Sequence, residues 1–350
     1  MISQYNYTTA DWRNQLAVND RKTKIVIALF IAIYILVGFL IDLYLHPEIH
    51  KYTFLEQLNL FIDMQVMPYA TLILGGVAVV SVFITFALYD KIVLLGTDYH
   101  EVTHDNARSL DEKQLYNVIE ELKLAAGMQY MPKIYIIEAE YMNAFASGYS
   151  EKSALIAITR GLLLKLERDE LQAVMAHELS HIRHHDIKLT LMATVLSNIM
   201  LIAIDFLFYS MLFGGGNRRS NSEDGENNDN RLFFVVAILR FVLPLLTVIL
   251  LMYLSRTREF MADAGAVELT RDNSPLAKAL LKISQDHVAN KQEYAVAYGQ
   301  TAHENVRRAA YIFDPVQAGI KIQEAAGSIF STHPPLKARL KALGFAQNGK

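Results

Sequence analysis

Two histidines separated by three residues form the strongest chemical pattern in the chain. The sequence His177-Glu-Leu-Ser-His181 lies within residues 170–181, whose pattern is helical. Residues four apart on a helix share one face, so both imidazoles can bind a single zinc ion. Glu178, one position further round, can then reach a water molecule beside the metal. An exposed helix could carry the same three side chains without a metal, so the residues elsewhere in the chain must decide.

A hydrolytic zinc ion needs a third protein ligand and one position left for water. The chain has no cysteine, which leaves His, Asp or Glu as ligands. Glu259 and Asp263 lie four apart in a helix predicted to open at Ser255, so Glu259 can ligate while Asp263 fixes the tautomer of a ligand histidine. The alternatives are a solvated acidic face, or His184 or His185 as third ligand. A third ligand on the same helix would lie a further turn from the metal.

The composition indicates a membrane protein. Hydrophobic residues make up 52% of the 350 residues, and four stretches are long and apolar enough to cross a bilayer: 25–41, 64–89, 189–213 and 232–254. Buried core helices are the alternative, but such helices alternate polar and apolar faces. The formal charge of −3 argues against a dedicated nucleic-acid-binding protein.

Lys and Arg residues near the span ends predict the orientation, because they favour the cytoplasmic side. The side predicted to be cytoplasmic carries Arg13, Arg21, Lys22, Lys24, Lys91, Arg183, Lys188, Arg256 and Arg258, against Lys51, Arg218, Arg219 and Arg231 on the other side. This predicts a cytoplasmic segment 1–24, spans 1 and 2 within 25–89, a first soluble part 90–188, spans 3 and 4 within 189–254, and a second soluble part 255–350. The polar loop 214–231 lacks apolar periodicity and is predicted to be disordered.

The soluble parts mix helices and short strands. The pattern predicts a helix over residues 111–128, strands over 133–137, 143–147 and 154–159, and further helices from Glu167.

Four segments together resemble the HtpX family of membrane-bound zinc metallopeptidases, which are relatives of the CAAX prenyl proteases. They are His177-Glu-Leu-Ser-His181, Glu259-Phe-Met-Ala-Asp263, Asn143-Ala-Phe-Ala-Ser-Gly148 and Ser331-Thr-His-Pro-Pro335. Their order and spacing agree with the four-span topology, and the resemblance covers nearly the whole chain. The long loop 214–231 and the extended segment after residue 46 depart from the family pattern.

The resemblance assigns roles to individual residues. It implies His177, His181 and Glu259 as the ligands of one Zn²⁺ ion per chain and Glu178 as the catalytic glutamate. It further implies that Asn143 helps hold the substrate backbone, and that His333 and Arg339 stabilise the oxyanion. Independently of the family, Pro334 and Pro335 fix His333 rigidly before the predicted helix 336–343. A loop histidine, a solvated arginine and a turn asparagine are the alternatives for these last three residues.

We therefore expect a mostly α integral membrane protein, with four transmembrane helices and a cytoplasmic α+β zincin-type metalloprotease domain. The resemblance implies hydrolysis of misfolded or damaged membrane proteins in the bacterial inner membrane, as part of stress response and quality control. The expected partners are unfolded polypeptide or membrane-protein substrates and the lipid bilayer. One alternative is CAAX-type processing of lipidated peptides, which needs a chamber that four spans are too few to build. Another is a non-catalytic scaffold, which bound zinc would exclude.

Two charged residues lie within predicted spans. Asp205 and Arg240 are the lone charges of the third and fourth spans. Ionised groups in hydrocarbon usually pair or face water. We hypothesise an ion pair between them that docks the two spans, the alternative being that each reaches the outer membrane interface.

Overall fold

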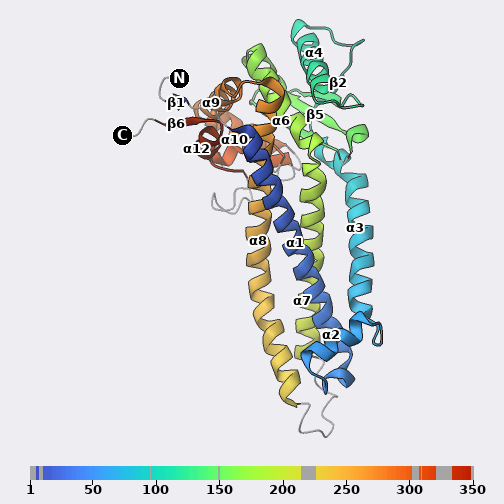
Figure 1. Cartoon of the computed structure of the whole chain (residues 1–350). Coiled ribbons are helices and arrows are strands. Elements are labelled where there is room, and N and C mark those ends of the chain that lie inside the picture. Colours follow the sequence, from blue (N-terminus) through green and yellow to red (C-terminus); the bar gives the residue numbers. More distant parts are fainter. Residues whose placement is uncertain are drawn as a thin grey trace. The chain divides into compact units, whose positions relative to one another are not determined.

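The computed structural model describes residues 5–7, 11–94, 96–148, 150–213, 226–301, 307–308, 310–320 and 333–347. They fall into two compact units, and most of them are helical, as predicted. The first unit comprises residues 1–23, 86–190 and 252–350, and the second comprises 24–85 and 191–251. Figure 1 labels many of the helices and strands of both.

The first unit contains a four-stranded sheet in the order β2-β3-β5-β4. Its strands are β2 (Tyr99–Val102), β3 (Lys133–Ile137), β4 (Ala144–Ser147) and β5 (Leu155–Thr159). β3 and β5 are parallel, and the other two pairs are antiparallel. The three predicted strands are confirmed to within one residue at their start, whereas β2 was not predicted. β4, which follows Asn143 directly, lies at the edge of the sheet.

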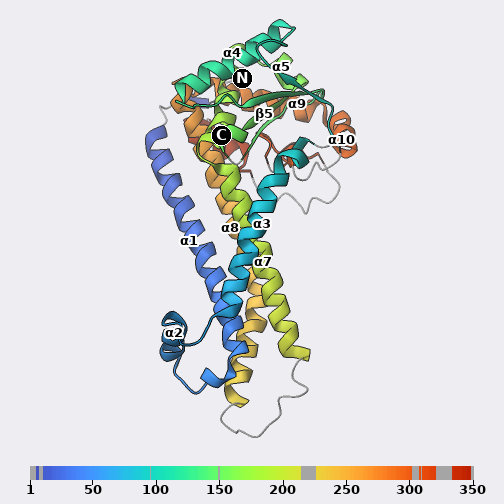
Figure 2. The same cartoon turned by 90° about the vertical axis from the view of Figure 1, so that its right-hand side faces the viewer.

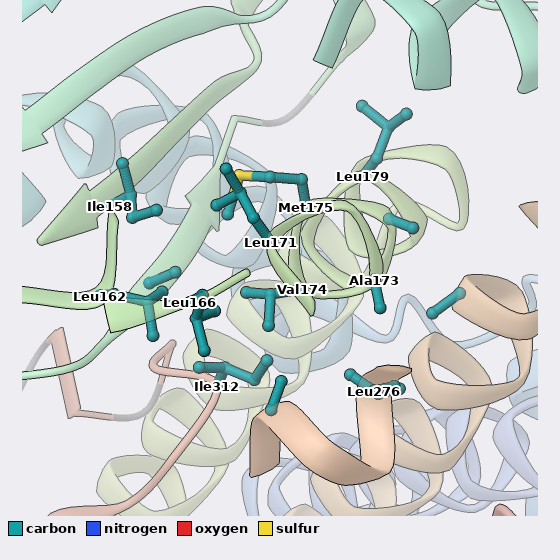
Figure 3. Packing of buried hydrophobic residues seen from close by; sticks show 14 of the residues in the cluster. Ile158, Leu162, Leu166, Leu171, Ala173, Val174, Met175, Leu179, Leu276 and Ile312 are labelled. Carbon is teal, nitrogen blue, oxygen red and sulfur yellow. The ribbon is translucent and has the colours of Figure 1, made fainter. Parts of the chain in front are cut away.

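Helix α6 (Arg168–Arg183), which carries the histidine pair, lies in the centre of this unit. It packs against α4 (Leu110–Ala125), α9 (Ser274–Ala289) and β4. Figure 3 shows the apolar side of α6, where Leu171, Val174 and Met175 belong to the same cluster as Ile158 of β5 and Leu162 of α5 (Arg160–Lys165). These side chains are buried, so the apolar core fixes where the polar face of α6 points.

Strands near the two ends of the chain pair in this unit. β1 (Tyr5–Tyr7) pairs antiparallel with β6 (Phe345–Gln347), which follows α12 (Leu336–Ala342). Gln15 adds a hydrogen bond from its side-chain amide to the carbonyl of Ala342, at 2.6 Å. Helix α10 (Lys291–Gln300) follows α9 in the same unit.

Helix α8 (Glu226–Thr270) corrects two expectations. A new helix was predicted to open at Ser255, but α8 runs without interruption through that point for 45 residues, with Pro244 inside it. Residues 226–231, predicted to belong to a disordered loop, form its first turns, while residues 214–225 lie outside the described part of the chain. Glu259 therefore sits on a direct continuation of an apolar helix.

The second unit is built from α1 (Trp12–Leu45), α3 (Tyr69–Leu94), α7 (Asp186–Phe213) and α8, which run alongside one another in Figures 1 and 2. Among the described residues, three helical stretches are long and apolar enough to cross a membrane, within α1, over Leu189–Phe213 and over Arg231–Thr270. The apolar helix Tyr69–Thr85 is shorter. The second predicted span began at Met64, five residues before α3 does.

Asp42 explains where α3 begins. Its fully buried carboxylate accepts hydrogen bonds from the backbone N–H groups of Ala70 and Thr71, at 2.7 and 3.0 Å, and from the Thr71 hydroxyl at 2.7 Å. The first N–H groups of a helix have no partner within the helix, so a carboxylate there stabilises its start. The sequence analysis did not identify this contact.

The predicted pairing of the two span charges is confirmed. Arg240 donates from Nε to Asp205 Oδ1 at 2.7 Å and from a terminal nitrogen to the Tyr209 hydroxyl at 2.8 Å. The guanidinium also lies over the ring of Phe208, 4.7 Å from its centre. The pair links α7 to α8 within the second unit.

Reversing either charge should destabilise the detergent-solubilised protein, because it leaves two like charges in contact. The expected loss approaches the roughly 2.5–3.5 kcal/mol that one unpaired ion costs in hydrocarbon on insertion scales. Thermal unfolding of Asp205→Arg, Arg240→Asp and the double variant measures this. The double variant should recover most of the loss, and a loss equal to the sum of the two singles would mean that the pair contributes nothing.

Candidate metal centre

Helix α6 brings the two histidines together in the first unit. The helix starts with a reciprocal cap in which the Glu170 carboxylate accepts a hydrogen bond from the Glu167 backbone at 3.0 Å. One turn apart, the rings of His177 and His181 turn their Nε2 atoms toward each other, 3.2 Å apart. His177 is fully buried and His181 nearly so.

Glu259 of α8 completes a group of three potential ligands. Its carboxylate oxygens lie 3.7 Å from His177 Nε2 and 3.6 Å from His181 Nε2. These three residues offer ligand atoms that all lie within 4.8 Å of one another. Neither His184 nor His185, the alternative third ligands, belongs to that group.

Each histidine has a carboxylate at its other ring nitrogen. Asp263 of α8 lies 3.0 Å from His177 Nδ1, and Asp186 at the start of α7 lies 2.8 Å from His181 Nδ1. A carboxylate at Nδ1 favours the tautomer that carries its proton there and leaves Nε2 with a lone pair. The two Nε2 lone pairs and the Glu259 carboxylate then converge on one point. Together they form a set of donors for a cation.

The spacing of the donors fits zinc. Bonds of about 2.0–2.1 Å in tetrahedral geometry place neighbouring ligand atoms about 3.3 Å apart. The corresponding distances here are 3.2, 3.6 and 3.7 Å. Burial, followed by the influence of His177, lowers the pKa of His181 to about 3, so its imidazole is neutral, the form that binds metals.

Two arginines hold the two carboxylates. Arg339 of α12 grips Asp263 with two hydrogen bonds, at 2.9 and 2.6 Å. Arg258 of α8, itself buried, contacts Asp186 and donates to the carbonyl of His184 at 2.6 Å. Each ring is therefore fixed by a chain of histidine, aspartate and arginine.

The sequence analysis missed Asp186 and Arg258. Asp186 reaches back to His181 because His185 adopts a left-handed conformation, with φ of 55°, at the end of α6. Such a conformation is uncommon for a residue other than glycine, and it gives the chain the sharp turn between α6 and α7. An aspartate five residues after the second histidine was the available signal, but spacing alone does not reveal a turn of this kind.

The remaining member of the histidine motif, Glu178, is fully buried. Neither of its carboxylate oxygens makes a hydrogen bond of normal geometry to a described residue. Burial raises the pKa of Glu178 well above its usual range, and the neighbouring Glu259 carboxylate raises it further, against the effects of Arg339 and the Ala146 N–H. A carboxylate with a raised pKa is suited to accepting and returning a proton near neutral pH.

His333 and Arg339 both reach Glu259. His333 Nδ1 lies 3.5 Å and the Arg339 guanidinium 3.4 Å from Glu259 Oε2. Burial lowers the pKa of His333 but the Glu259 carboxylate raises it, and the net shift is upward. Arg339 also donates to the Ile312 carbonyl at 2.6 Å, so with its bonds to Asp263 most of its donors already have partners inside the protein.

Asn143, expected to bind the substrate backbone, has internal partners. Its amide nitrogen donates to the Phe313 carbonyl at 3.0 Å and to the Tyr298 hydroxyl at 3.2 Å, and its side chain is fully buried. His287 in turn lies 2.9 Å from that hydroxyl. In this structure the asparagine therefore joins the start of β4 to the segment around Phe313.

That segment also lies along the edge of β4. Tyr311 forms a β-bridge with Phe145, and the Ile312 N–H donates to the Ala144 carbonyl at 2.9 Å. An extended peptide could add to the same edge only where its backbone groups are not already paired in this way.

A glycine allows α6 and α8 to approach closely. A methyl group added at Gly265 would lie 2.3 Å from Ser180 Oγ and 2.9 Å from its Cβ. Any larger side chain would push the helices apart, and with them the histidines and Glu259.

Comparison with known proteins identifies the family of the chain. The model of peptidase family M48 matches residues 109–345, so the chain belongs to peptidase family M48 and is a metallopeptidase. It is 39% identical over 328 residues to a protein named Protease HtpX homolog from Helicobacter pylori (strain Shi470), covering 94% of this chain and 96% of that one. A Protease HtpX homolog from Listeria monocytogenes serovar 1/2a is 38% identical over 266 residues, covering 73% and 83%. The chain is thus an HtpX-like membrane metallopeptidase, as the motifs predicted.

A solved structure also aligns with the chain. The crystal structure of S. mikatae Ste24p is 20% identical, with a TM-score of 0.47, over 97% of this chain and 68% of that one.

Proposed function

We propose that the protein is a zinc endopeptidase that hydrolyses unfolded or damaged membrane proteins at the cytoplasmic face of the bacterial inner membrane. The convergence of His177 Nε2, His181 Nε2 and the Glu259 carboxylate is the observation that carries the proposal. Zinc held by these three residues would polarise the scissile carbonyl and acidify a water molecule. Glu178 takes the proton from that water and later passes it to the leaving amine.

The residues around the ligands have distinct roles in this mechanism. His333, next to Glu259, is placed to stabilise the negative charge that develops on the carbonyl oxygen. Arg339 acts mainly through Asp263, because its strongest contacts are with that carboxylate. Asn143 orients the edge strand β4 for the substrate, and its own amide becomes available only if the contact with Phe313 opens.

Four membrane spans with both termini in the cytoplasm agree best with the chain's own contacts. The antiparallel pairing of β1, near the N-terminus, with β6, near the C-terminus, supports a topology in which both strands lie on one side of the membrane and the number of spans is even. Helix α3 supports a fourth span beside the three longer candidates: it has 26 residues, and its apolar stretch over Tyr69–Thr85 precedes the charges Asp90 and Lys91. The distribution of Lys and Arg then favours the cytoplasm for the first unit.

Incubation of the purified protein with an unfolded membrane protein tests the proposal directly. Mass spectrometry should find internal cleavage products, which a zinc chelator abolishes and added zinc restores. The same substrate in its folded state is the control and should be cut slowly. Release of a short C-terminal peptide alone, or cleavage that survives chelation, would contradict the proposed activity.

Asp186 and Arg258 form a positioning pair for His181 in this proposal. The Asp186→Asn variant keeps the shape but removes the charge that holds the proton on His181 Nδ1, so zinc affinity should fall by about 10–100-fold. Competition with a chromophoric chelator measures that affinity.

Asp169→Asn, an exposed change in the first turn of the same helix, is the matched control and should leave the zinc affinity unchanged. Equal affinities of the two variants would remove Asp186 from the metal site.

A further inference from the structure

The short helix α2 (Phe54–Ile62) belongs to the second unit and has no part in the metal site. It lies between the end of α1 at Leu45 and the start of α3 at Tyr69, and Figure 2 shows it beside that end of α1. Its nine residues divide into three faces.

One face docks α2 onto the protein. Phe61 is buried and meets the ring of Phe39 of α1 edge-on, with 5.6 Å between ring centres. Gln57, also buried, donates to the carbonyls of Ile49 and Tyr52, at 3.1 and 3.0 Å. These two anchors, one turn apart, prevent the helix from rolling about its axis.

A second face is apolar and points away from the protein. Leu55, Leu58 and Ile62 follow the three- and four-residue spacing of one helical face. Leu55 is 70% and Ile62 65% exposed. The third face is polar and exposed and carries Glu56, while Asn59 borders the apolar face, four residues from Leu55 and three from Ile62. Because the docked face fixes the rotation of α2, this apolar face cannot turn inward and must meet its surroundings.

The second residue after α2 is also apolar and exposed. Met64 has a left-handed backbone, with φ of 54°, at the position where helices usually end in glycine. Its side chain is 59% exposed, and Met67 follows at 45%. The chain thus keeps a large apolar side chain where glycine would be less strained.

We propose that α2 lies in the interface of the lipid bilayer, on the membrane face opposite the N-terminal segment, with Leu55, Leu58, Ile62 and Met64 inserted between the lipids. Short connections join α2 to two apolar helices, so it cannot lie far from the membrane surface. The helix that follows, α3, also carries exposed apolar side chains near its start, including Leu72 and Ile73. An apolar face beside a polar face is typical of helices that insert about 5–10 Å into the headgroup region.

The absence of cysteine makes site-specific labelling straightforward. Leu55→Cys, Ile62→Cys and Glu56→Cys can each carry one environment-sensitive fluorophore in the full-length protein, reconstituted in phosphatidylethanolamine and phosphatidylglycerol vesicles. Glu56 is the matched control, because it is exposed and lies between the two test positions along the helix but on the polar face. Quenching by a lipid spin-labelled near its headgroup reports lipid contact, and iodide reports water.

The labels at positions 55 and 62 should emit at shorter wavelength, and the spin-labelled lipid should quench them at least about twofold more than the label at 56. Iodide should show the opposite order. Equal iodide quenching at all three positions would place α2 in water and overturn the proposal. Blue-shifted emission at 55 and 62 that neither quencher reaches would mean that protein covers the face, as in association with a second copy, and would also overturn it. Two test positions keep the result decisive if one variant does not fold.

Discussion

The variant Glu178→Gln should retain its metal but lose peptide hydrolysis by about 10²–10⁴-fold, the contribution of a general base. The amide has nearly the size of the carboxylate, and Glu178 lies outside the group of three candidate ligands. The glutamine amide cannot, however, accept a proton from water. Zinc content by atomic absorption and the initial cleavage rate should be measured on the same sample.

Two results would contradict the role of Glu178 as the base. A Glu178→Gln variant with one zinc per chain and a rate within tenfold of the unmodified protein would mean that another group is the base. A variant without zinc would show instead that the glutamate supports the metal site.

Replacing Glu259 with alanine should remove the metal itself. Two histidines alone leave zinc with too few protein ligands, since hydrolytic zinc sites use three. In the variant, the Nε2 atoms of His177 and His181 would still lie 3.2 Å apart, but the Glu259 carboxylate next to them would be missing. We expect zinc occupancy to fall far below one at low free zinc, together with loss of activity.

Two further variants test the assignment of the third ligand. Glu268→Gln changes a carboxylate nine residues further along the same helix, where it pairs with Arg183, and should keep full zinc occupancy. His185→Ala should do the same, because His185 is exposed and outside the ligand group. Zinc loss in His185→Ala with retention in Glu259→Ala would reverse the proposed ligand set.

The parts of the site that sequence could predict are those fixed by helix geometry. Residues four apart on a helix must share a face, which brings His177 and His181 together and aligns Glu259 with Asp263. The strands were predictable for a similar reason, since the β-branched and apolar run over residues 133–137 is bounded by turns.

The parts that could not be predicted depend on tertiary contacts or on an unusual backbone. The polar run after Leu254 resembled the end of a span followed by a new helix, yet no glycine or proline interrupts it, so α8 continues. Asp186 meets His181 only through the left-handed turn at His185. Nor does any local pattern show that Asn143 donates to Phe313, because that contact joins residues 170 positions apart.

Along the chain, the two histidines precede residues 191–251, which form the hairpin of α7 and α8, and Glu259 follows them. This order determines when each candidate ligand is made during synthesis. The ribosome completes both histidines before any of residues 191–251 exists, whereas Glu259 follows them. A chain that has not yet made its hairpin lacks the third ligand and Asp263 as well. On the proposed ligand set, a nascent or truncated chain therefore cannot assemble the centre in the cytosol. On that ligand set, the metal centre forms only after the hairpin has been made.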